Sequence, residues 1–276
     1  MTGSLASFCL MAIAGRELAG TISTLQILFC RGLIGLLLVS LVILQRRRYA
    51  LFQTRRLKLH LGRNLFHFVG QYGWFVGIGL LPLAQVFALE FTTPLWTLLI
   101  SCLVLKESLT LRKVAAILLG SLGVVLMLNL GTTTVSAASL YVVAAAIFYS
   151  LAYVATKSLS ATEDPLTILF YMCLLQLPVG VLFGVNSFVS PTAMQWCWLS
   201  LIGLTALSGH FCITRAMQTT DASVVVTLDF LRLPLIAGVG VLVYRETFNP
   251  MLVVGAALML LGNLANLYKP RLKPWK

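Results

Sequence analysis

Apolar stretches of membrane-spanning length follow one another along almost the whole chain, and the short gaps between them hold most of the charged residues. A helix needs about 20 predominantly apolar residues to cross a bilayer. Of the 276 residues, 59% are hydrophobic and only 10% are charged, which is too little polar surface for a water-soluble fold. The sequence therefore predicts an all-α membrane protein with ten transmembrane helices. The predicted helices lie near residues 1–19, 24–44, 62–81, 84–105, 113–130, 138–156, 165–187, 195–217, 222–244 and 251–268.

Basic residues are divided unevenly between the two sides of this predicted bundle. If both termini are cytoplasmic, the inner segments hold sixteen of the twenty lysines and arginines, whereas the outer segments hold only Arg16 and Arg245. Arg31 and Arg232 lie inside predicted helices. Cytoplasmic loops of membrane proteins carry such an excess of basic residues. We therefore expect a multi-pass protein of the cell inner membrane with both termini in the cytoplasm, and the net charge of +12 reflects orientation rather than nucleic-acid binding.

Other polar features are expected to be structural. Lys106–Glu107 and Arg245–Glu246 close two predicted helices, where they would be charged ends at the membrane surface. The six cysteines have no metal-ligand spacing and behave as small hydrophobes, so neither a metal nor a cofactor is expected. The chain has no phosphate-binding loop, which excludes transport driven by its own ATP hydrolysis. Met1 leads directly into an apolar stretch, so no cleavable signal peptide is expected.

The two halves of the chain carry the same pattern. A shift of 139 residues places Glu90 on Asp229. The same shift aligns identical residues, namely Gly70 with Gly209, Leu89 with Leu228, Phe91 with Phe230, Glu107 with Glu246 and Gly123 with Gly262. With five helices in each half, the second copy must enter the membrane from the opposite side. The sequence thus predicts two inverted five-helix repeats, at 1–130 and 138–268, followed by a basic cytoplasmic tail at 269–276.

Four segments resemble the EamA repeat of the drug/metabolite transporter superfamily. They are Gln26–Gly32 (QILFCRG), Ala88–Trp96 (ALEFTTPLW), Val104–Thr110 (VLKESLT) and Ala116–Val124 (AILLGSLGV). The resemblance covers nearly the whole chain in two copies. It implies ten helices with both termini inside, and a role as an exporter of amino acids and metabolites or as an importer of S-adenosylmethionine or riboflavin. The first helix starts later than is usual in the family, as expected of a truncated N-terminus.

Four ionisable side chains lie inside predicted helices, where each costs about 2.5–3.5 kcal/mol at the helix centre. Arg31 and Glu90 lie about six residues from the outer ends of their helices, so we expect them to approach within about 4 Å in at least one state. Asp229 and Arg232 are three residues apart and can pair along one helix face. These groups fit gating or zwitterion binding, and equally a structural role. A proton relay is less favoured, because a neighbouring arginine stabilises the ionised carboxylate.

Polar and aromatic residues mark a candidate substrate cavity. Gln71 and Trp74 share one face of the third helix with His67, and repeat symmetry places His210 opposite Gln71. We expect His67, near the cytoplasmic end of its predicted helix, to be an interfacial histidine. The residues predicted to line the cavity are Gln71, Trp74, His210, Tyr149 and Tyr153, of which the two tyrosines could equally face a neighbouring helix.

A polar and aromatic cavity between inverted repeats is typical of a secondary transporter that works by alternating access. We expect it to export a small amphipathic metabolite, amino-acid-like or opine-type. Import of a nutrient such as S-adenosylmethionine or riboflavin is the alternative. A membrane-embedded enzyme is disfavoured, because each candidate acid has an arginine nearby. The expected partners are the substrate and the lipid bilayer, with proton coupling left open, and the protein is expected to be a monomer or a homodimer that binds no nucleic acid.

The charge distribution makes a testable prediction about topology. Reporter fusions placed after Gly131 and after Ser187 should both give an external signal, because each follows an odd number of crossings from a cytoplasmic N-terminus. Alkaline phosphatase and fluorescent-protein fusions measure this directly. A cytoplasmic signal at either position would contradict the ten-helix arrangement.

Overall fold

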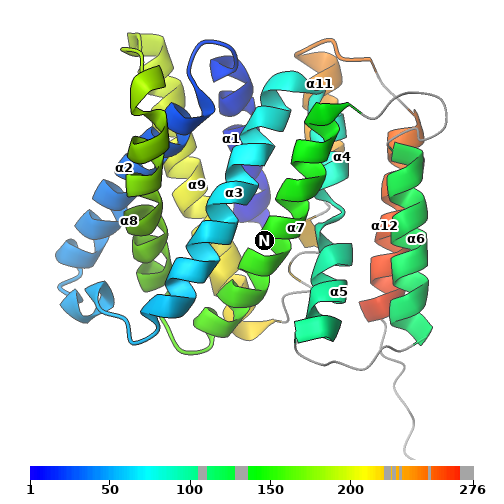
Figure 1. Ribbon diagram of the computed structural model, residues 1–276, viewed down its shortest axis with the longest axis horizontal. Helices are drawn as coiled ribbons and strands as arrows, with labels where there is room; N and C mark the ends of the chain where they lie inside the picture. Colours follow the sequence, from blue (N-terminus) through cyan, green and yellow to red (C-terminus); the bar gives the residue numbers. More distant parts are fainter. Residues whose placement is uncertain are drawn as a thin grey trace, which may run out of the picture.

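The computed structural model describes residues 1–104, 111–127, 136–220, 225, 228–229, 232–247 and 250–267. Its regular structure in these ranges is entirely helical, and Figure 1 shows the helices side by side in one bundle. The α-helices are α1 Thr2–Leu18, α2 Thr24–Gln45, α3 Leu57–Leu80, α4 Leu83–Glu90, α5 Thr93–Val104, α6 Leu111–Met127, α7 Ala137–Ser160, α8 Pro165–Gly184, α9 Ala193–Thr219, α11 Arg232–Leu242 and α12 Pro250–Leu267. Two short 3₁₀ helices are η1 Tyr49–Phe52 and η2 Val185–Ser187.

The order of the helices follows the predicted apolar runs. Within the described residues, five stretches are both long and apolar enough to cross a membrane. They are Thr24–Gln45, Leu83–Ile100, Ala137–Ser160, Pro165–Gly184 and Ala193–Thr219, and α12 contains the shorter apolar stretch Val253–Gly262. The predicted tail at 269–276 and the Lys106–Glu107 pair lie outside the described residues.

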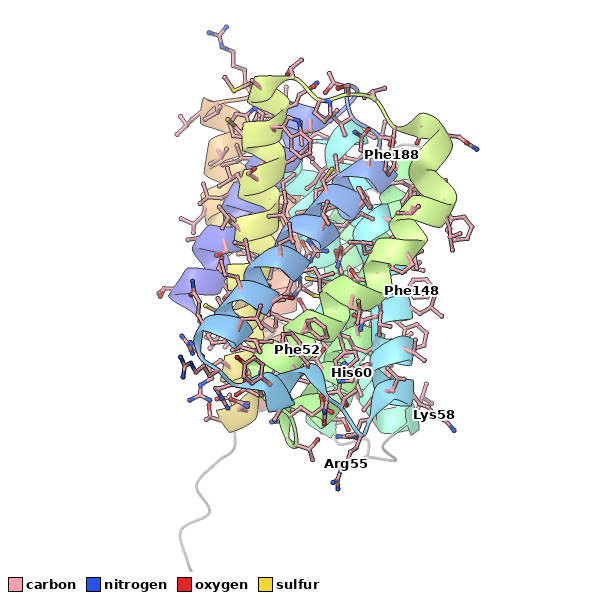
Figure 2. All side chains as sticks on the ribbon, turned by 90° about the vertical axis from the view of Figure 1, so that its left-hand side faces the viewer. Phe52, Arg55, Lys58, His60, Phe148 and Phe188 are labelled. Atoms are coloured by element: carbon pink, nitrogen blue, oxygen red, sulfur yellow. The ribbon has the colours of Figure 1, made fainter. Side chains whose placement is uncertain are left out.

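The third helix begins earlier than its apolar run. It was expected from about residue 62, yet α3 starts at Leu57 and so includes Lys58 and His60. Residues such as leucine and lysine have good helix propensity and extend a helix beyond the membrane core. Figure 2 shows Phe52, Arg55 and Lys58 at the same end of the bundle, which we call the basic end, and Phe188 at the opposite end.

The fourth predicted helix is divided in the middle of the bundle. α4 ends at Glu90 and α5 begins at Thr93, with Pro94 in its first turn. Proline is tolerated there because the first N–H groups of a helix have no intrahelical acceptor. Side chains bond the backbone around the break: the Thr93 hydroxyl donates to the Glu90 carbonyl, and Ser150 Oγ of α7 donates to the Thr93 carbonyl at 2.9 Å. The break places Glu90 at a helix end inside the protein.

Neighbouring helices come from opposite halves of the chain. α1 packs on α9, and α3 packs on α7. In the same way, α2 packs on α8, α4 on α11 and α6 on α12. The first helix of each half thus contacts the third helix of the other, and the second, fourth and fifth contact their own counterparts. This pattern is unchanged when the halves are exchanged, as expected of equivalent repeats related by a twofold axis. The α6–α12 pair lies at one edge of the bundle (Figure 1).

The buried core lies between α1, α3, α4 and α9. Its large side chains include Phe8, Leu18, Trp74, Phe87 and Met217, each at most 3% exposed. A second, smaller group of buried apolar residues joins α2 to α8. Both halves of the chain contribute side chains to the larger core. Polar groups inside this core therefore lie between the two halves.

Close packing of α3 on α7 generates a prediction. A Cβ atom on Gly73 would lie 2.7 Å from the Tyr141 carbonyl oxygen, and a backbone atom cannot move aside as a side chain can. We expect Gly73→Ala to lower the free energy of unfolding by about 1–3 kcal/mol.

Gly62→Ala is the matched control in the same helix, because no described heavy atom lies within 4 Å of its Cβ position. This variant should be neutral or slightly stabilising, since alanine favours a helix over glycine by about 1 kcal/mol. Thermal unfolding of the purified variants compares them. Equal midpoints would contradict the close approach of α3 and α7.

Candidate functional site

Three charged side chains meet where α4 ends, and we call them the charged cluster. Arg232 Nη2 donates to Glu90 Oε1 at 2.9 Å and lies 2.5 Å from Asp229 Oδ2. The Trp74 indole N–H donates to Glu90 Oε2 at 2.7 Å. Glu90, Asp229 and Arg232 are each at most 6% exposed. One arginine therefore serves two carboxylates, and the cluster has a net charge of −1 when all three are ionised.

Aromatic rings surround the arginine of this cluster. The Arg232 guanidinium carbon lies 4.9 Å from the ring centroid of Phe8, 5.2 Å from that of Phe87 and 5.8 Å from that of Phe91. Each distance is within the range of a cation–π contact. The rings exclude water and stabilise the positive charge, so the ion pairs form in a largely apolar setting.

A network of neutral polar side chains extends from the charged cluster toward the basic end. Gln71 accepts a hydrogen bond from Arg31 Nη1, and its amide nitrogen donates to His67 Nδ1. Gln176 of α8 donates to the same His67 nitrogen at 3.0 Å. The His67 ring is 4.7 Å from the ring of His210, centroid to centroid. We call these residues and Arg31 the polar network, which joins α2, α3, α8 and α9.

A narrow cavity connects the charged cluster to the polar network. It is lined by Phe8, Met11, Arg31, Gln71, Trp74, Phe75, Glu90, Tyr149, Tyr153, His210 and Arg232. All five residues predicted to bind substrate thus lie together, with three of the four predicted charged residues, and the fourth, Asp229, contacts Arg232. The cavity volume is about 20 Å³, room for about one water molecule. A metabolite therefore requires a wider conformation than this one.

One expectation about an individual residue is corrected, and another is not met in this conformation. Arg31 was expected to approach Glu90 in at least one state, and here Arg31 donates to Gln71 while Glu90 binds Arg232 of the other half. Equal depth in the membrane does not determine which helices are lateral neighbours. His67 was expected at the interface, yet it is 2% exposed. Because α3 starts at Leu57, His67 lies about 15 Å along the helix, well inside the bundle.

A further ion pair closes the end of the bundle opposite the basic end. Glu246 was expected to be a charged group at the membrane surface, but its side chain is 8% exposed. Its carboxylate accepts from the Leu83 backbone N–H at 2.9 Å, at the start of α4, and from Arg16 Nη2 at 3.2 Å. Arg16 also donates to the carbonyls of Ile78 and Leu81 at 2.6 and 2.8 Å. This Arg16–Glu246 network ties α1 to the ends of α3 and α11 and to the start of α4.

Some residues of the site were not predicted from the sequence. Phe8, Met11 and Phe75 line the cavity but are apolar residues in apolar helices, so nothing in the sequence distinguishes them from core. Gln176 did carry a signal, because an amide two residues before Pro178 interrupts an otherwise apolar run. Arg63 was assigned to the cytoplasmic segment, but it is 3% exposed and donates to Thr156 Oγ1 at 3.1 Å.

The charged cluster generates a prediction about stability. Arg232→Ala leaves Glu90 and Asp229 buried beside each other without a counter-charge. Removing one partner of a buried ion pair costs about 3–5 kcal/mol. Arg48→Ala is the control, because Arg48 binds Asp164 at 3.2 Å with its own side chain 51% exposed, and exposed pairs contribute about 1 kcal/mol or less. Thermal unfolding measures the stability of both variants. Equally small losses of stability in the two would show that the charged cluster is not a stabilising ion pair.

Comparison with known proteins identifies the family. The model of the EamA-like transporter family matches residues 1–129 and again 136–268. One crystal structure superposes on 96% of this chain and 94% of its own chain, with a TM-score of 0.70 and 20% sequence identity. This likeness shows that the two proteins share a fold.

Three curated relatives have named substrates. The pseudopaline exporter CntI of Pseudomonas aeruginosa is 27% identical over 94% of this chain and 91% of its own length. The riboflavin transporter of Vibrio cholerae is 32% identical over 76% of this chain and 71% of its own. The S-adenosylmethionine uptake transporter of Rickettsia prowazekii is 23% identical over 79% of this chain and 74% of its own length.

These matches confirm the predicted all-helical membrane fold of ten helices and its two EamA domains. They also confirm that the protein is a transporter and not an enzyme. The chain therefore belongs to the EamA-like transporter family of the drug/metabolite transporter superfamily, as a multi-pass membrane protein that transports small molecules.

Proposed function

We propose that this transporter exports a small amphipathic metabolite, amino-acid-like or opine-type, by alternating access through the central cavity. The observation that carries the proposal is the lining of that cavity, in which aromatic rings alternate with an amide, a histidine, two arginines and a carboxylate. Such a surface fits a solute with charged groups and an apolar part. Both halves of the chain supply lining residues, as expected of a midplane site at a repeat interface.

The closed Arg16–Glu246 network supports alternating access. It joins α1, α3, α4 and the segment after α11 at the end of the bundle opposite the basic end. With the termini and the basic segments cytoplasmic, this end faces outward, so the conformation is one in which the outer side is held shut. A route from the cavity to that side requires these charge-assisted hydrogen bonds to break.

Export of an opine-type metabolite is supported by the pseudopaline exporter, which aligns with this chain over nearly the full length of both proteins. Import of S-adenosylmethionine or riboflavin is the alternative, because relatives named for those activities match three quarters or more of this chain. We place the protein in the cell inner membrane with both termini cytoplasmic, as a monomer or homodimer, and proton coupling stays open.

Transport by reconstituted protein tests this proposal. Proteoliposomes of known orientation are loaded with pseudopaline, amino acids, riboflavin or S-adenosylmethionine, and efflux and uptake are followed by mass spectrometry. Efflux of the opine or an amino acid toward the external face is the expected result. Preferential uptake of riboflavin or S-adenosylmethionine would establish the alternative, and transport of none of them would reject the proposed substrate class.

Two substitutions test the cavity itself. Gln71→Ala and His210→Ala should each reduce transport strongly while folded protein in the membrane stays near the wild-type amount, because both side chains are polar groups that line the cavity. Loss of a core side chain would instead cost about 2–5 kcal/mol and lower the amount of protein. Gln218→Ala, near the end of α9 where Gln218 binds Arg215, is the control with unchanged transport. Normal transport in both cavity variants would remove these residues from the substrate path.

A further inference from the structure

Arg31 is a buried cation with two unused donors. Its residue is 5% exposed, and one guanidinium nitrogen, Nη1, donates to Gln71. The other two nitrogens, Nε and Nη2, are buried and have no hydrogen-bond partner in the part of the chain that the structure describes. A buried donor without an acceptor is costly, about 1–3 kcal/mol and more for a charged group, so two on one side chain require an explanation.

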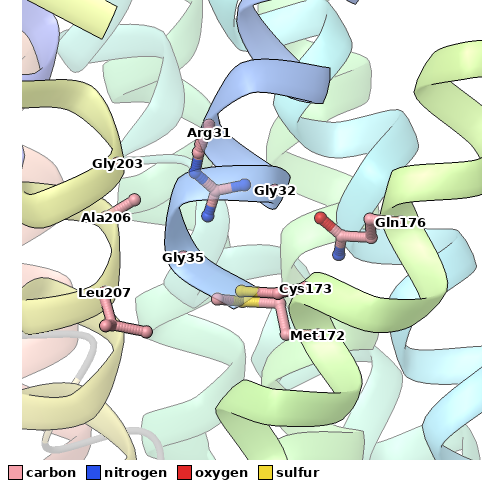
Figure 3. Close-up of a pocket in the computed structure, with 9 residues that line it drawn as sticks. All are labelled: Arg31, Gly32, Gly35, Met172, Cys173, Gln176, Gly203, Ala206 and Leu207. Atoms are coloured by element: carbon pink, nitrogen blue, oxygen red, sulfur yellow. The ribbon is translucent and has the colours of Figure 1, made fainter. Parts of the chain in front are cut away.

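The space beside Arg31 is a pocket between three helices. Figure 3 shows the guanidinium of Arg31 on α2, with Ala206 and Leu207 of α9 on one side and Cys173 and Gln176 of α8 on the other. The described residues that line this pocket include no carboxylate. Arg31 also lines the central cavity, so its side chain borders both spaces.

Glycines create this pocket by letting the helices approach. A Cβ on Gly35 would lie 2.7 Å from Cys173 Sγ, and a Cβ on Gly203 would lie 2.6 Å from Ile34 Cγ2. The walls around the guanidinium are glycine backbone and apolar side chains, with Gln176 as the polar exception. Such walls offer few competing hydrogen-bond acceptors, so the free edge of Arg31 has no rival partner among them for a ligand that enters a wider conformation.

The charges of the site are divided between its two ends. Glu90, Asp229 and Arg232 together carry −1, whereas Arg31 has no carboxylate within 4 Å among the described residues. A lone charge in a low-dielectric interior is strongly unfavourable unless it is paired. One ordered water could accept a hydrogen bond from Arg31 but would leave its charge uncompensated. An anionic group would accept the hydrogen bonds and also compensate the charge.

The geometry of the free donors narrows the class of that group. Nε–H and Nη2–H point in parallel from one edge of the planar guanidinium, and this edge binds the two oxygens of a carboxylate at once. The third nitrogen is occupied by Gln71, which holds the plane in place. The free edge of Arg31 is thus complementary to a carboxylate.

We propose that Arg31 is the anchor for a carboxylate of the transported metabolite, bound through Nε and Nη2. This proposal rests on the proposed function and deepens it, because it requires every good substrate to carry a carboxylate. Gln71 and Gln176 orient the anchor and its ligand, and the aromatic residues of the central cavity receive the rest of the molecule. The negative cluster at the far end favours a positive or neutral group there.

Acetate and acetamide test the anchor without knowledge of the substrate, since they have the same shape and differ in charge. Binding of each to wild-type protein in lipid nanodiscs is measured by saturation-transfer NMR. We expect saturable acetate binding and at least about tenfold weaker acetamide binding, as for loss of a charge-assisted bidentate pair. Arg31→Gln should abolish the acetate signal, and Arg31→Lys should weaken it because a point charge replaces the fork. Arg215→Gln, an exposed arginine on α9, should leave it unchanged.

Each outcome decides the question. Equal binding of acetate and acetamide, no saturable acetate binding, or acetate binding that persists in Arg31→Gln would overturn the anchor. The wild-type comparison stands even if Arg31→Gln does not fold. Failure of the proposed function is distinguishable, because it appears as absent metabolite transport in proteoliposomes while Arg31-dependent acetate binding remains. Conversely, transport of a metabolite without any carboxylate would reject the anchor and leave the transporter role intact.

Discussion

The ion pairs of Arg232 with Glu90 and Asp229 constrain the rest of this structure. Three charges inside a membrane protein are unfavourable unless they compensate one another, so the helices that carry them must stay in contact. Glu90 belongs to the first half of the chain, and Asp229 and Arg232 belong to the second. The cluster therefore holds the halves together at the level of the cavity, and the rings of Phe8, Phe87 and Phe91 keep water from it.

The break between α4 and α5 makes this arrangement possible. A continuous helix through residues 83–104 would carry Glu90 in mid-helix, and the break instead makes Glu90 the last residue of α4, where Trp74 and Arg232 each bind one of its oxygens. Pro94 favours the interruption because it cannot donate to a carbonyl one turn earlier. Irregular backbone at membrane depth is tolerated where neighbouring side chains bond it, as Thr93 and Ser150 do here.

Properties that depend on composition and spacing are those that this sequence predicts best. The helix order, the equivalence of Gln71 and His210, and the gathering of polar residues around one cavity all follow from apolar periodicity and the repeat. Lateral contacts do not, because depth along a helix says nothing about the direction a side chain faces. For that reason the sequence does not show that Glu90 binds Arg232 rather than Arg31 in this conformation. Glu246 was misplaced because a carboxylate that caps a buried helix start has the same local sequence as one in solvent.

The short helix α4 links the central site to the outer closure. Its first N–H, at Leu83, is bound by Glu246, and its last residue, Glu90, is bound by Arg232. Eight residues of helix span about 12 Å, so α4 reaches from the outer closure to the central site. An opening that separates α4 from α11 must break both contacts together, whereas one that carries α4 with α11 away from α1 and α3 keeps both and breaks the Arg16–Glu246 and Trp74–Glu90 bonds instead. The second route leaves no charge of the central cluster unpaired and is therefore the less costly one.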